Sequence, residues 1–111
     1  MNKKEFGQSG ENKAEEYLKS RGYQILDRNF RSRFGELDLI ALDNTTLVFV
    51  EVKTRSSNNF GRPEEAVTAK KLAHIKLTGE YYASLHPNLP TSHRIDVVSI
   101  ESDKIQLINV S

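Results

Sequence analysis

The sequence has no cysteine among its 111 residues, which excludes a disulfide framework and a thiolate metal site. It also has no apolar run near the ~20 residues that a membrane-spanning helix needs. Its first residues, MNKKEFGQSGENKAEE, are polar and lack the apolar segment of a secretory signal. These absences lead us to expect a soluble, cytoplasmic protein with no membrane partner.

An excess of charge of one sign is also missing. Lysine and arginine number 16 against 15 acidic residues, so the formal net charge is +1. This balance is not that of a strongly basic nucleic-acid-binding domain, so binding to a polyanion would need local clusters of charge. Two clusters exist: Arg28, Arg31 and Arg33 in RNFRSR, and Lys53 with Arg55 farther along. A solvated basic loop and a phosphate-contacting surface explain them equally well.

The pattern of apolar residues predicts seven elements in one domain, residues 1–111. Helical spacing covers about residues 7–21, with Gly22 as a C-terminal stop, and again about residues 64–85. Strands are expected at residues 23–33, in a hairpin at 35–55, and at 94–100 and 105–110. The order α-β-β-β-α-β-β predicts an α/β domain with a mixed sheet.

The hairpin, GELDLIALDNTTLVFVEVKTR, has acids and a lysine set into otherwise apolar strands. Because side chains alternate across a strand, one face is wholly apolar, whereas the other is apolar only near the turn. Apolar residues on both faces indicate that both faces are covered, which places the charged end in a cleft. The apolar face is predicted to carry Leu37, Leu39, Ala41, Val48, Val50 and Val52, and the charged end Glu36, Asp38, Glu51 and Lys53.

The turn sets which acids face each other. A two-residue turn pairs Asp43 with Thr46, a four-residue loop gives the same register, and both place Asp38 opposite Glu51. Opposed side chains have Cβ atoms roughly 5 Å apart, so two half-buried carboxylates there repel each other. A shared proton, Lys53 or a metal ion would offset the repulsion, and carboxylate oxygens suit Mg²⁺ or Mn²⁺.

A plainer interpretation is a wet sheet face on which Glu36 and Glu51 form ion pairs with Lys53. The apolar half of the same face argues against it, whereas a one-residue slip in register would remove the pairing of the acids.

A fourth acid, Glu11, lies on the same helical stripe as Ala14 and Leu18, which should pack against the sheet. A carboxylate there is costly unless it is paired or lies at the rim. The alternative is an ordinary first-turn glutamate that the helix dipole favours.

An aspartate on one strand and Glu-x-Lys on the next, here Asp38 and Glu51-Val52-Lys53, resemble the PD-(D/E)xK nuclease superfamily. Leu37 stands where the motif has proline, which is a common departure. The blocks GENKAEEYLKSRGYQIL, GELDLIA, LVFVEVKTR and RIDVV together resemble the YraN-type family of uncharacterised bacterial proteins, distant relatives of archaeal Holliday junction resolvases. This resemblance covers nearly the whole chain.

The resemblance implies a restriction endonuclease-like fold, a central mixed sheet flanked by helices. It implies that Asp38, Glu51 and the backbone carbonyl of Val52 ligate Mg²⁺ or Mn²⁺. It also implies that Lys53 orients or activates the attacking water. Glu11 matches a helical glutamate that completes many such catalytic metal sites.

We therefore expect a metal-dependent endonuclease that hydrolyses phosphodiester bonds of nucleic acid, DNA in the first place, with selectivity for junction-type structures. A homodimer would agree with the dimeric resolvases. The alternatives are a non-catalytic nucleic-acid-binding module and an interaction protein whose hairpin charges only form ion pairs; the intact acid–lysine set favours the enzyme. The residues expected to contact DNA are Arg28, Arg31, Arg33, Arg55, Lys70 and Lys71, and Glu36 is expected to support the metal ligands.

Overall fold

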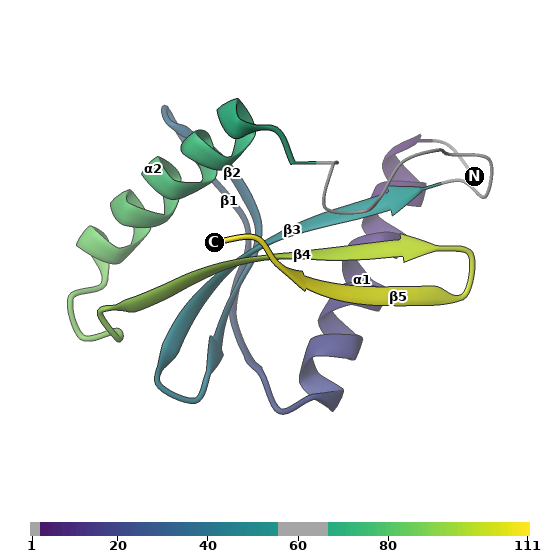
Figure 1. The fold of residues 1–111 in the computed structure, drawn as a ribbon, viewed down its shortest axis with the longest axis horizontal. Helices are drawn as coiled ribbons and strands as arrows, with labels where there is room; N and C mark the ends of the chain where they lie inside the picture. The colour runs from purple at the N-terminus through teal and green to yellow at the C-terminus, as the bar shows by residue number, and fades with distance from the viewer. Residues whose placement is uncertain (1–2, 56–66) are drawn as a thin grey trace.

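A five-stranded mixed sheet with one helix on each face forms the architecture of the computed structural model, which describes residues 3–55 and 67–111 (Figure 1). Strands β3 and β4 are parallel, and the other neighbours in the order β1-β2-β3-β4-β5 are antiparallel. The order α-β-β-β-α-β-β and the mixed sheet were both predicted, and both are confirmed. The elements are α1 (Lys3–Ser20), β1 (Gln24–Ser32), β2 (Gly35–Asp43), β3 (Thr46–Arg55), α2 (Ala69–Leu85), β4 (Ser92–Glu101) and β5 (Lys104–Asn109).

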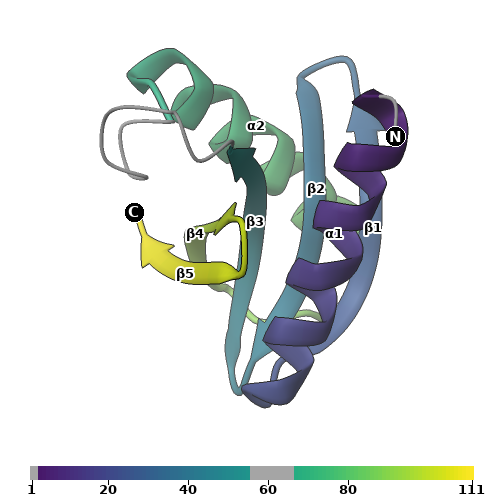
Figure 2. The same cartoon turned by 90° about the vertical axis from the view of Figure 1, so that its right-hand side faces the viewer.

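Both faces of the sheet are covered, as the apolar pattern indicates. Helix α1 lies on one face and α2 on the other, and α2 is the crossover that joins the parallel strands β3 and β4 (Figures 1 and 2). Neither helix of the described chain is long and apolar enough to cross a membrane. The α1 core includes Ala14, Leu18, Leu39, Val48 and Val50, and the α2 core includes Leu37, Ile40, Phe49, Ile75 and Tyr82.

The helix ends differ from the predicted bounds. Helix α1 begins earlier, at Lys3, and is followed by Gly22 with a φ of 91°, a left-handed conformation that stops the helix as expected. Helix α2 begins later, at Ala69, because the Thr68 side chain accepts a hydrogen bond from the Lys71 amide (3.1 Å) and caps it. The predicted helix began at about residue 64, and residues 64–66 lie outside the described residues.

Side-chain alternation along β2 breaks at Asp38. Leu39 packs under α1, but Leu37 packs in the α2 core, so the prediction that both share one face is wrong. In β1, Asn29 lies between the partners of these two leucines and has a φ of 53°. A strand residue in the left-handed conformation interrupts the alternation of side chains, so the next side chain points to the opposite face of the sheet. The local twist therefore sends Phe30 and Leu37 to the α2 face.

The close approach of α2 to the sheet depends on Gly79. A Cβ at this position would lie 2.6 Å from Cδ2 of Phe49, whose ring is buried. We expect Gly79→Ala to lower the free energy of unfolding by about 1–3 kcal/mol, because the buried ring or the helix must shift to make room for the Cβ. Helix propensity alone would raise stability by up to ~1 kcal/mol. Urea denaturation measures the sign, and a stabilised variant would contradict this packing.

Candidate metal centre

The candidate centre lies where β2 and β3 separate. Their ladder has the predicted register from Asp43–Thr46 to Leu39–Val50, and it ends one pair before Asp38 would meet Glu51. Figure 2 shows β2 and β3 diverging toward the end opposite their turn. The acids of the hairpin therefore border a fork between two strands, where side chains can enter between them.

Asp38 bridges this fork through its side chain. Its Oδ2 accepts a hydrogen bond from the backbone amide of Val52 at 2.7 Å, in place of a backbone ladder bond. The aspartate thus meets β3 at the residue after Glu51, and the strictly opposed pair that the register predicted gives way to this side-chain contact. The bond holds the carboxylate in a half-buried position beside the ExK segment.

The acids that were predicted from the sequence interact electrostatically with Asp38. The pKa of Asp38 is raised to about 7, first by burial and then by the negative charge of Glu51. Glu11 and Glu36 add smaller contributions of the same sign, whereas the Val52 amide opposes them. A carboxyl group with a pKa near neutrality inside a cluster of acids is typical of functional sites.

Glu51 has a counter-ion that the sequence did not indicate. Lys71 Nζ, from the first turn of α2, lies 3.6 Å from Glu51 Oε1. Burial raises the pKa of Glu51, and the charges of Lys71 and Lys53 oppose this rise. Lys71, which we expected to contact DNA, therefore neutralises the candidate centre. No spacing in the sequence links Lys71 to Glu51.

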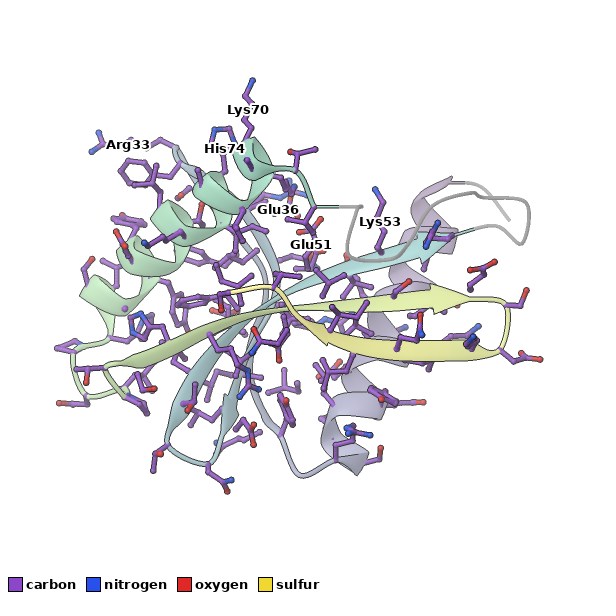
Figure 3. The ribbon with its side chains drawn as sticks, viewed as in Figure 1. Arg33, Glu36, Glu51, Lys53, Lys70 and His74 are labelled. Atoms are coloured by element: carbon purple, nitrogen blue, oxygen red, sulfur yellow. The ribbon has the colours of Figure 1, made fainter. Side chains whose placement is uncertain are left out.

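Lys53 and Glu36 lie beside Glu51. All three side chains project on the side of the sheet that carries α2 (Figure 3). Lys53 is exposed, and Glu36 forms an exposed ion pair with Arg31 at 3.5 Å. Its predicted partner across the hairpin was Lys53, and the separation of the strands explains the different pairing.

Glu11 approaches from α1. Gly10, the residue before it, packs directly on the Thr54 side chain of β3, so the helix backbone comes close to the strand. Glu11 Oε2 is buried and has no hydrogen-bond partner in the described part of the chain, with Arg28 Nη2 at 4.0 Å. A buried carboxylate oxygen without a hydrogen bond is costly, which makes it suitable as a cation ligand.

The donor chemistry fits a divalent metal. Within residues 3–55 and 67–111, no three histidine, cysteine or acidic side chains form a ready-made metal cluster. Mg²⁺, however, is commonly held by one or two carboxylates and keeps several of its waters. Asp38 and Glu51 supply two such carboxylates, and the charge of Glu11 acts on Asp38.

The predicted DNA-contacting residues differ in their surroundings. Arg28 donates hydrogen bonds to Glu15 (2.9 Å) and Asn12 (2.8 Å), so α1 holds it. Arg55 is only 9% exposed. Arg28 is nevertheless exposed, as are Arg31, Arg33, Lys70 and Lys71.

Comparison with known proteins identifies relatives along most of the chain. The model of the uncharacterised protein family UPF0102 matches residues 10–100, a range that includes all four proposed site acids and Lys53. A UPF0102 protein of Caldicellulosiruptor saccharolyticus is 51% identical over 100 residues, which cover 90% of this chain and 85% of the relative. One from Persephonella marina is 46% identical over 99 residues (89% and 85%), and one from Alkaliphilus oremlandii is 56% identical over 82 residues (74% and 69%). The resemblance to the YraN-type family is confirmed: the chain belongs to the uncharacterised protein family UPF0102.

Proposed function

We propose that this protein is a metal-dependent nuclease that hydrolyses phosphodiester bonds of DNA, with its centre at Asp38, Glu51 and Lys53. The observation that carries the proposal is the position of Asp38, half-buried against Val52 with its pKa raised to about 7 by burial and by Glu51. Folding gains nothing from placing two repelling acids at one point, whereas a metal site requires it. An ion-paired surface would leave these acids in water.

Metal binding and stabilisation of charge on the phosphate are proposed for different residues. Asp38, Glu51 and the Val52 carbonyl would hold Mg²⁺ or Mn²⁺, with Glu11 as a further ligand. The chemistry that such an ion would supply is polarisation of the phosphodiester and a lower pKa for a bound water. Lys53, exposed beside Glu51, donates a hydrogen bond to a phosphate oxygen or to the attacking water and stabilises the charge that develops on the phosphate.

Lys53→Ala separates chemistry from metal binding. We expect the variant to keep the metal-induced rise in melting temperature and to lose roughly 10²-fold or more in cleavage rate, as other enzymes do without one charge-stabilising donor. Cleavage is measured on duplex, flap and four-way-junction DNA with Mg²⁺ or Mn²⁺. Lys104→Ala, which removes an exposed lysine of β5, is the matched control. A Lys53→Ala protein that cuts at the wild-type rate would rule out this role.

We also propose selectivity for branched DNA and a homodimeric state, because the chain resembles junction resolvases. The junction substrate tests the first, and sedimentation with and without DNA tests the second.

A non-catalytic nucleic-acid-binding module is the second candidate. The Lys71–Glu51 ion pair favours it, because a lysine already neutralises part of the acid cluster without a metal. This candidate predicts DNA binding that is independent of divalent ions and no cleavage of any of the three substrates.

A further inference from the structure

A second surface, separate from the acid cluster, lies between β1 and the C-terminal half of α2. It is an open groove of about 530 Å³. Its lining contains aromatic, aliphatic and basic side chains but no acid. The lining residues are Phe30, Arg31, Ser32, Arg33, Tyr81 and Leu85.

The α2 side of this groove is an exposed apolar stripe. Leu77, Tyr81 and Leu85 recur at every fourth residue and are 48%, 39% and 52% exposed. The core side of the same helix, with Ile75 and Tyr82, is buried separately. Packing of the sheet therefore does not explain the stripe, and contiguous exposed apolar side chains of this kind mark interaction sites.

Aromatic rings connect the two walls of the groove. The ring of Tyr81 lies 5.5 Å from that of Phe34, at an interplanar angle of 60°, and 6.2 Å from that of Phe30. Phe30 is itself fixed by an edge contact with buried Tyr82, at 5.0 Å. The rings are thus anchored from below, while Tyr81 presents part of its surface to solvent.

The charges on the β1 side are positive and accessible. The Arg33 guanidinium stacks over the Phe34 ring at 4.9 Å and projects away from the sheet (Figure 3). The Arg31 side chain is 77% exposed, and its ion pair with Glu36, at 3.5 Å, is an exposed contact that water weakens. Both guanidinium groups can therefore take a phosphate at little cost.

We propose that this aromatic–arginine groove binds an unpaired segment of nucleic acid, with a base against Tyr81 and phosphates at Arg31 and Arg33. Single-strand binding sites combine these two features, because every base has a face that stacks and every linkage carries a charge. The charge and the rings together favour this occupant over a second copy of the chain, since two exposed arginines call for an anionic ligand and the exposed Tyr81 ring calls for one with flat faces.

The choice of nucleic acid as the ligand rests on the proposed nuclease function. The groove in turn restricts the expected substrate to DNA with an unpaired segment. Arg31 pairs with Glu36, and Glu36 acts electrostatically on both Asp38 and Glu51. The Arg31–Glu36 pair, which joins β1 to β2, therefore links the groove to the acid cluster. A strand held in the groove continues toward the cluster, so the preferred DNA contains unpaired nucleotides beside the bond that is cut.

The test measures binding without a metal, so that it does not depend on cleavage. Fluorescence anisotropy follows a short labelled oligothymidine, and a duplex of equal length, with the full chain in EDTA. Tyr81→Leu should weaken oligothymidine binding by about tenfold, the loss typical of one stacked base. Tyr81→Phe, which keeps the ring, should bind as the wild type does. Arg33→Gln should reduce the slope of log affinity against log salt by about 0.7, the value for one phosphate of a single strand.

Several results would contradict the proposed binding of unpaired nucleic acid in the groove. Equal affinity of Tyr81→Leu and Tyr81→Phe, with unchanged melting temperatures, would exclude stacking, and tighter binding of the duplex would exclude the unpaired ligand. Self-association that Tyr81→Leu abolishes, with no oligothymidine binding, would assign the groove to a second copy. DNA cleavage without oligothymidine binding would refute the groove as a binding site and leave the proposed nuclease activity intact. Ring-dependent oligothymidine binding without cleavage would support the groove and refute the nuclease activity.

Discussion

Mn²⁺ or Mg²⁺ should raise the melting temperature of the wild-type protein, and Glu51→Gln should abolish both this rise and DNA cleavage. A ligand that binds only the folded state stabilises it by mass action, by about 2.7 kcal/mol at one hundred times its Kd. For a domain of this size, that corresponds to a rise on the order of 10 °C. The effect should be large here because a cation also removes the repulsion between Glu51 and Asp38.

Three variants make this measurement specific. Asp38→Asn should also lose the metal response, because it removes the other ligand charge. Lys71→Ala should show the response at a lower ion concentration, since the lysine that competes for Glu51 is gone. A wild type without any response at saturating ion, or a Glu51→Gln protein that cleaves normally, would refute the nuclease. The hairpin charges would then be an ion-paired surface, and the interaction protein would be the better interpretation.

Asp38→Asn should stabilise the metal-free protein at pH 8. In the folded state the pKa of Asp38 is about 7, against an ordinary value of 3.8, so between these pH values the folded state binds more protons than the unfolded state. Stability contributed by this group therefore falls as pH rises from about 4 to 7. The full loss above pH 7 is roughly 4 kcal/mol, since the pKa of Asp38 differs by about 3 between the two states and one pKa unit corresponds to about 1.4 kcal/mol.

Denaturation in EDTA at several pH values measures this slope. An asparagine still accepts the hydrogen bond from Val52, so the variant removes the charge and keeps the contact. Its stability should exceed that of the wild type at pH 8 and approach it near pH 4. Glu16→Gln, at an exposed position of α1, is the control and should follow the wild type. An Asp38→Asn protein that is less stable at pH 8 would mean that the carboxylate is stabilised there by its surroundings.

Local patterns predicted the sheet because its causes are local. The tight turn set the register from Asp43–Thr46 to Leu39–Val50, and within this paired stretch alternation then fixed which residues entered each core. Apolar residues on both faces indicated a covered sheet, and the order of elements limited the topology to one with a parallel pair. The same reasoning brought Asp38 and Glu51 to one end of the hairpin, where their charges interact.

The sequence by itself thus determined the elements, their order, the register near the turn and the acids of the candidate centre. Only the tertiary structure decided how the far end of the hairpin opens, because alternation orders side chains only while two strands stay paired. Past Leu39 the ladder ends, Asn29 reverses the facing of its neighbours, and Asp38 bonds to the Val52 amide. The structure also decided the partner of Glu51. The packing of α2 on the sheet brings Lys71 to that carboxylate, and a contact made by packing leaves no periodic signal in the sequence.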